Sequence, residues 1–90
     1  MRIYITAVHL EGGAGHEHIQ SVKWQDVDTG ETEQSTRAAI VSWLGKSENT
    51  AWVHDGVGAV QVLVVRASPP YIRSYADGRW TDNLLALPRF

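Results

Sequence analysis

The stretch AVQVLVVRA at residues 59–67 carries apolar side chains on both of its alternating sides. Valines occupy the even positions from 60 to 64, while Leu63 and Val65 occupy odd ones. Strands in the interior of a sheet often have such continuous apolar runs, because both of their faces are shielded from water. The stretch therefore predicts a central strand of a β-sheet.

The segments next to this stretch are expected to add strands to the same sheet. Residues 50–54 (TAWVH) are joined to it by Asp55-Gly56-Val57-Gly58, a connection typical of a hairpin. Pro69-Pro70 ends the stretch, since proline has no N–H to donate to a ladder. Residues 71–75 (YIRSY) then predict a last strand, and Ala76-Asp77-Gly78-Arg79 predicts a tight turn that brings the chain back.

The N-terminal part of the chain predicts two more strands. Residues 2–10 (RIYITAVHL) alternate with period 2 and are rich in β-branched side chains, and the glycine-rich residues 12–15 interrupt them. A second strand is expected at about 17–27. Its apolar residues change parity partway along, which predicts a bulge near Gln20-Ser21.

The triplet Asp28-Thr29-Gly30 invites comparison with the active site of a dimeric aspartic protease. That chemistry needs two aspartates in a dry cleft, where they share one proton. Here the neighbours are Asp26, Glu31 and Glu33, which describe a hydrated turn. We expect a hairpin turn followed by a short third strand around 31–34.

One helix is expected, from an N-cap at Ser35 or Thr36 to about Gly45. Ile40, Trp43 and Leu44 have the spacing of a buried stripe along it. The prediction is a small α+β fold, an antiparallel β-sheet with one α-helix packed on one face, in the order ββ(β)αβββ. Residues 1–90 form a single domain, in which 81–90 is a leucine-rich C-terminal tail.

Composition restricts the functions that the chain can have. It has 90 residues, no cysteine and a formal net charge of -2, so disulfides and thiolate metal sites are absent. No apolar run is long enough to span a membrane and no signal peptide is recognisable, which favours a soluble, cytoplasmic protein without a membrane partner. The small size favours binding over catalysis. Nucleic-acid binding is not expected, because the four arginines of residues 66–90 are scattered among acids.

His16-Glu17-His18 is a candidate metal site. In an extended chain His16 and His18 project from the same face, and two imidazoles with a carboxylate could bind a divalent ion such as Zn²⁺. This would make the chain a small metal-dependent hydrolase or nuclease. The alternative is that both imidazoles bond backbone or solvent and that the protein has no cofactor.

The last third of the chain carries residue types that are enriched at binding surfaces. The candidate partner-binding residues are Tyr71, Arg73, Tyr75, Arg79, Trp80, Leu84 and Leu87. They could equally complete a small core, and the leucines must either dock on the domain or expose an apolar patch. A third hypothesis is weak binding of single-stranded nucleic acid by stacking on Tyr71, Tyr75 and Trp80.

Several segments resemble an uncharacterised family of bacterial and phage proteins, domain-of-unknown-function family 3892. The ending Tyr71-Ile72-Arg73-Ser74, Asp77-Gly78 and Asp82 to Pro88 is similar to that of the family, as are Ile5 to Val8 and His16 to Ile19. The resemblance implies no catalytic residue or cofactor. It implies a phage accessory protein, and we expect a non-enzymatic interaction module that binds a bacterial host protein or a second copy of itself.

Overall fold

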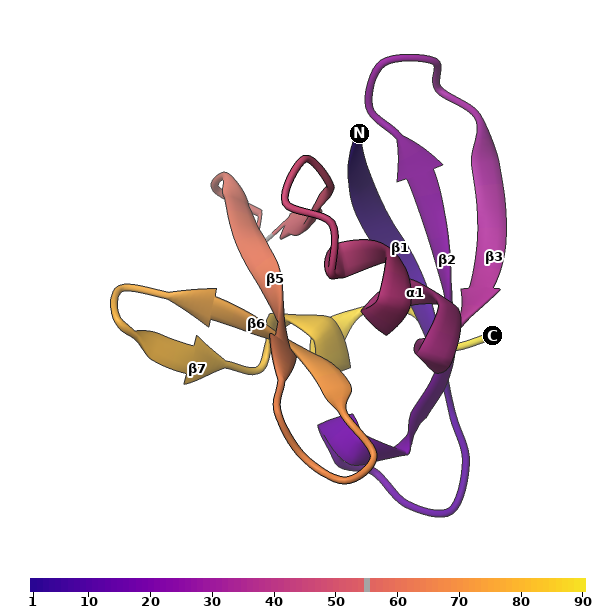
Figure 1. Ribbon diagram of the computed structural model, residues 1–90, viewed down its shortest axis with the longest axis vertical. Helices are drawn as coiled ribbons and strands as arrows, with labels where there is room; N and C mark the ends of the chain where they lie inside the picture. Colours follow the sequence, from indigo (N-terminus) through magenta and orange to yellow (C-terminus); the bar gives the residue numbers. More distant parts are fainter. Residues whose placement is uncertain (55) are drawn as a thin grey trace.

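The computed structural model describes residues 1–54 and 56–90 as one curved sheet with short helices inside the curve (Figure 1). The strands are β1 (Arg2–Leu10), β2 (Ile19–Asp26), β3 (Thr32–Thr36), β4 (Thr50–His54), β5 (Ala59–Val65), β6 (Tyr71–Ala76) and β7 (Arg79–Thr81). The helices are the 3₁₀ turns η1 (His16–His18) and η2 (Asn83–Ala86) and the α-helix α1 (Arg37–Leu44). The predicted α+β class is confirmed. Asp55, in the expected connection 55–58, lies outside the described residues.

The sheet is mixed, so the expectation of a wholly antiparallel sheet is wrong for one pair of strands. The order is β3-β2-β1-β4-β5-β6-β7, and β1 runs parallel to β4 while the other neighbours are antiparallel. The reason lies in α1, because it carries the chain from β3 across the sheet to the free edge of β1. The predicted order also lacked β7, the short returning strand that contains Trp80.

A bulge and the 3₁₀ turn η1 shape the hairpin that β1 and β2 form. His9 pairs with Ser21 and Leu10 pairs with Ile19, which leaves Gln20 unpaired and confirms the predicted bulge. The bulge allows both Ile19 and Val22 to be completely buried. The second strand begins at Ile19 and not at 17, because the residues before it form the 3₁₀ turn η1.

The hairpin turn between β2 and β3 is exposed and organised by one carboxylate. The Oδ1 atom of Asp26 accepts hydrogen bonds from the N–H groups of Asp28, at 2.8 Å, and of Thr29, at 3.2 Å. Gly30 takes a φ of 78°, which glycine adopts without steric cost. The Asp-Thr-Gly triplet is therefore the hydrated turn that its acidic neighbours predict.

One face of the sheet, the inner face, holds the core. Alternate residues of the central strands are buried there, including Ile3, Ala51, Val62, Ile72 and Ser74. The helix α1 contacts β2, β3, β5 and β6, and η2 contacts β1, β4 and β6. Figure 1 shows both helices between the β1–β3 half and the β5–β7 half of the sheet. The other face, the outer face, keeps its side chains half-buried or exposed, apart from Ala7, which pairs with Lys23 and is buried.

The helix and the central strand follow the sequence predictions closely. The Thr36 side chain caps α1 by accepting a hydrogen bond from the N–H of Ala39 at 3.2 Å. Ile40 is buried in the core. The strand β5 lies between β4 and β6 as predicted, yet only Val60 and Val62 are buried, since Leu63, Val64 and Val65 are half-buried.

The C-terminal tail is docked on its own domain. Leu84 is 0 % exposed, and Leu85 and Leu87 pack against the core. The end of the tail pairs with β1, because Val8 donates its N–H to the Pro88 carbonyl at 2.9 Å and accepts from the Phe90 N–H at 3.2 Å. Beyond Tyr4, where the ladder between β1 and β4 ends, the tail takes the neighbouring place beside β1.

Candidate functional site

The structure divides the predicted C-terminal surface into exposed and buried parts. Arg79 and Trp80 are exposed, Tyr71 and Tyr75 are half-buried on the outer face, and Leu84 is completely buried. Leu84 was placed among the partner-binding residues, and this is corrected because a fully buried side chain cannot contact a partner of the folded protein. Leu87 is half-buried against the core.

Arg73 has a structural role at the join between β6, β7 and the tail. Its Nε–H donates to the Thr81 carbonyl at 3.1 Å, and its Nη2 group donates to Oδ1 of Asp82 at 2.8 Å. The Arg73 side chain is only partly exposed, and its ion pair with Asp82 largely matches its charge within the chain. A substitution at Arg73 would therefore disturb the fold as well as any surface.

The outer face carries a row of aromatic side chains, of which Tyr75 and Trp80 were predicted binding residues and Tyr4 and Trp52 were missed. Adjacent strands bring the residues into line, since Tyr4 pairs with Trp52, Trp52 with Gln61, Gln61 with Tyr75, and Tyr75 with Trp80. We call these five residues, four aromatic ones and Gln61 between Trp52 and Tyr75, the aromatic row. The ring centroids of Tyr75 and Trp80 lie 5.1 Å apart in an edge-to-face arrangement. Alternation within residues 50–54 predicts that Trp52 lies on the face opposite to the buried residues. Its neighbours on the adjacent strands, however, depend on the strand order.

The two histidines of the candidate metal site are separated by their local geometry. His16 is 5 % exposed and His18 is half-buried beside the glycine-rich loop, and neither Nε2 of His16 nor Nδ1 of His18 has a hydrogen-bond partner among the described residues. The expectation that they project from one face of an extended chain is wrong, because a 3₁₀ turn rotates each residue by about 120°. Among the described residues, no three His, Cys, Asp or Glu side chains form a metal-binding group.

Metal binding by His16 and His18 stays a prediction, and the metal content of protein purified without a histidine tag tests it. The environment of His16 opposes protonation of its imidazole, which would place a second positive charge near Arg73. Burial, followed by the positive charge of Arg73, lowers the pKa of His16 from its ordinary value of 6.5. Its imidazole is therefore held neutral, as a ligand must be, but also away from water.

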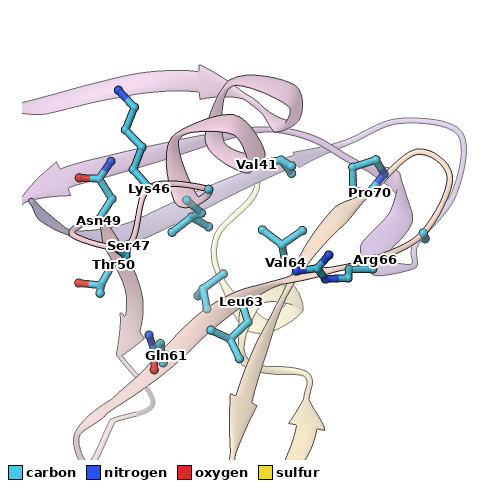
Figure 2. A pocket seen from close by; sticks show the side chains of 14 residues that line it. Val41, Lys46, Ser47, Asn49, Thr50, Gln61, Leu63, Val64, Arg66 and Pro70 are labelled. Carbon is cyan, nitrogen blue, oxygen red and sulfur yellow. The ribbon is translucent and has the colours of Figure 1, made fainter.

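A groove of about 750 Å³ lies between the C-terminal end of α1 and the edge of β5 (Figure 2). Val41 and Leu44 of α1 form one wall, the loop from Gly45 to Thr50 forms another, and residues 61–64 of β5 form the floor. The sequence reading missed this groove because its walls come from segments about twenty residues apart. Its volume falls within the range of about 300–1,000 Å³ that is common for ligand sites.

The groove follows a stretch of β5 that has a strand neighbour on one side only. The ladder with β4 ends at the pair Ala51 and Val62, whereas the ladder with β6 continues through Leu63, Val64 and Val65. In the described part of the chain, these three residues therefore have a strand neighbour on one side only, and Leu63 and Val64 present their open edge to the groove. An edge of this kind can accept a further strand through its backbone N–H and C=O groups.

The groove has a basic rim. Lys46 and Arg66 line it from opposite sides, and none of the described residues that line it is Asp or Glu. Both cations are exposed, and Figure 2 shows them at the two ends of the groove with Leu63 and Val64 between. The remaining polar contacts come from Ser47, Asn49, Thr50 and Gln61. The groove thus combines an open strand edge, apolar walls and positive charge.

The fold and these surfaces define a small α+β domain with a curved mixed sheet and an open internal edge. The family model of proteins of unknown function, DUF3892, matches residues 4–88, and the chain belongs to this family. The comparison with curated proteins found no match, and neither did the comparison with solved structures. No helix in the described residues is long and apolar enough to cross a membrane.

Proposed function

We propose that this chain is a non-enzymatic protein-interaction module that captures an extended, acidic segment of a partner protein in the groove beside β5. The observation that carries the proposal is the strand edge at Leu63 and Val64, which lie beyond the end of the ladder with β4 and line a groove of about 750 Å³. Peptides that add a strand to a sheet edge gain affinity from main-chain hydrogen bonds and specificity from pockets for alternate side chains.

The charge of the rim favours an acidic segment. Lys46 and Arg66 would each face carboxylates of the added strand, and the lining contains no carboxylate to oppose them. The chain as a whole carries a net charge of -2, so this local positive charge is a departure from the average surface. Such complementarity steers association and selects the partner more than it adds raw affinity.

The walls favour apolar side chains at alternate positions of the same segment. Val41 and Leu44 are half-buried on the α1 side of the groove, and Pro70 also lines it. An added strand would direct every second side chain toward these walls and the others toward solvent. The expected partner sequence therefore alternates acidic and β-branched residues. A phage origin, which the family resemblance implies, would make a bacterial host protein the natural source of it.

Binding of a labelled eight-residue peptide of alternating Glu and Val tests this proposal by fluorescence anisotropy. The acidic peptide should bind, whereas a peptide of alternating Lys and Val should not. Lys46→Glu with Arg66→Glu should weaken binding by about tenfold or more, because repulsion replaces attraction. Arg2→Gln and Lys23→Gln, which remove exposed cations outside the groove, are the matched controls.

Two further measurements identify the binding mode and the source of the strand. A peptide methylated on alternate backbone nitrogens cannot complete the ladder, so equal affinity for it would contradict strand addition. Sedimentation equilibrium of the protein alone distinguishes a partner from a second copy. A dimer that dissociates in the Lys46→Glu and Arg66→Glu variant would show that the occupant is an acidic segment of this chain, such as the exposed Glu31–Glu33 region.

A further inference from the structure

The outer face of the sheet carries aromatic and basic side chains, whereas the acidic side chains of the described strands lie on the inner face. The residues of the outer face alternate along each strand with the buried residues of the inner face, or they pair with residues that do. They include the aromatic row and the cations Arg2, Lys23 and Arg73. Among the described strands, no Asp or Glu occupies a position on this face. The acidic strand residues Asp26 and Glu33 pair with Ile3 and Trp24, on the inner side.

The cations of this face lie beside aromatic rings. The guanidinium carbon of Arg2 lies 5.8 Å from the centroid of the Trp52 ring, and Nζ of Lys23 lies 4.8 Å from the centroid of the Phe90 ring. Both residues are exposed, so their charges remain accessible to a ligand. Arg73 contributes less, because Asp82 neutralises it at 2.8 Å. Among the described residues of this face, Arg2 and Lys23 are therefore exposed cations that lie beside aromatic rings.

The aromatic row is long enough to hold several stacked groups. It crosses five strands, and neighbouring strands in a sheet lie about 4.8 Å apart, so the row extends over roughly 19 Å. Trp80, at one end, is 38 % exposed, and the ring of Tyr4 near the other end is stacked on His54 at 4.0 Å. Stacking rings that are interleaved with cations form the type of surface that holds unpaired bases while neutralising phosphates.

We infer that the outer face binds single-stranded nucleic acid, with bases stacked on Trp80, Trp52 and Tyr75 and phosphates near Arg2 and Lys23. The expectation against nucleic-acid binding rested on arginines that are scattered along the sequence, and the fold gathers a different set of cations on one face. This surface shares Gln61 with the groove, but its cations Arg2 and Lys23 do not line the groove, whose charges are Lys46 and Arg66. The two surfaces can therefore be tested independently in the same protein.

The experiment measures anisotropy of fluorescein-labelled dT12 and U12 with the full chain at several salt concentrations. Binding is expected at low salt, with a slope of log K against log salt of about -1.4, since each phosphate neutralised on a single strand contributes roughly -0.7. Trp80→Ala should weaken binding by at least about fivefold, the loss of one stacking contact. A 12-base-pair duplex should bind more weakly, because its bases are not available for stacking.

Variants of the two cations supply a readout that does not depend on removing an aromatic side chain. Arg2→Gln and Lys23→Gln should each make the salt slope shallower by about 0.7. Arg2 also shares a surface hollow with Asp28 and Glu48, which makes Lys23→Gln the cleaner variant. Lys46→Gln and Arg66→Gln are the matched controls and should change neither affinity nor slope.

Three results would overturn the inference. The first is no anisotropy change at low salt, and the second is equal affinity for single strand and duplex, which would reduce the contact to charge alone. The third is a loss with Lys46→Gln and Arg66→Gln that equals the loss with Arg2→Gln and Lys23→Gln. The circular dichroism spectrum of each variant must match that of the parent protein, and Lys23→Gln keeps the test decisive if Trp80→Ala unfolds.

Discussion

The hydroxyl groups of Ser74 and Thr81 lie 2.7 Å apart across the β6–β7 pair, and Ser74 is completely buried. The Ser74 hydroxyl donates to the Thr81 carbonyl at 3.1 Å and accepts from the N–H of Asn83 at 3.1 Å. One buried side chain therefore joins the last hairpin to the start of η2. The C-terminal tail depends on this polar contact as well as on its leucines.

Ser74→Ala should lower the free energy of unfolding by about 1–3 kcal/mol, because it leaves the N–H of Asn83 without its buried acceptor. Urea denaturation followed by circular dichroism measures the change. Ser42→Ala on the exposed side of α1 is the control and should stay within about 0.5 kcal/mol of the parent protein. Equal effects of the two substitutions would contradict a structural role for the Ser74 network.

Leu84→Ala should lower the free energy of unfolding by about 2–5 kcal/mol, since it removes a completely buried side chain and leaves a cavity. Leu87→Ala should cost less, because Leu87 is only half-buried. Thermal and urea unfolding of both variants check this order. A larger effect at Leu87 than at Leu84 would show that the tail docks differently in solution.

Local features of the fold were predictable because each depends on a few adjacent residues. The helix cap at Thr36, the bulge at Gln20 and the positive φ at Gly78 all follow from residue type and spacing. The strand β5 was recognisable because its apolar run exceeds what an edge strand would carry. These predictions needed no knowledge of which strands are neighbours.

The parallel pairing of β1 with β4 was not predictable, and the candidate sites depend on it. This pairing places Tyr4 beside Trp52, and the groove forms where the end of α1 and the loop that leads to β4 lie beside β5. Both the aromatic row and the groove therefore arise from long-range topology. The burial of Leu84 has the same origin, because the tail returns to β1 only in the folded chain.

The free energy of unfolding should decrease as pH falls below 6.5 because of His16. Burial lowers the pKa of His16 in the folded protein, so the unfolded chain takes up a proton first as pH decreases below its ordinary value of 6.5. The stabilisation is present above that value and is lost as pH falls toward the folded pKa. Urea denaturation at pH 7.5, 6.5 and 5.5 with a chelator present should show the decrease, and His16→Gln should remove it.

His9 acts in the opposite direction and must be separated from this effect. A hydrogen bond to the Phe90 carbonyl, followed by one to Glu11, raises the pKa of His9. Its contribution is therefore present below pH 6.5 and is lost as pH rises through the raised pKa. His9→Gln should make the fall in stability on acidification steeper, whereas a shallower fall would show that the two histidines have been assigned the wrong signs.

Gly78→Ala should loosen the last hairpin without unfolding the domain. Asp77 and Gly78 have φ values of 54° and 78°, the two consecutive positive values of a type I′ turn. A Cβ atom at Gly78 meets open space, so the cost comes from the left-handed backbone and amounts to roughly 1–2 kcal/mol. Amide hydrogen exchange should accelerate in β7, where Trp80 lies, and stay unchanged in β1 and β2. Asp77→Gly is the matched control, because glycine accepts the same conformation, and a comparable acceleration in that variant would contradict the role assigned to the turn.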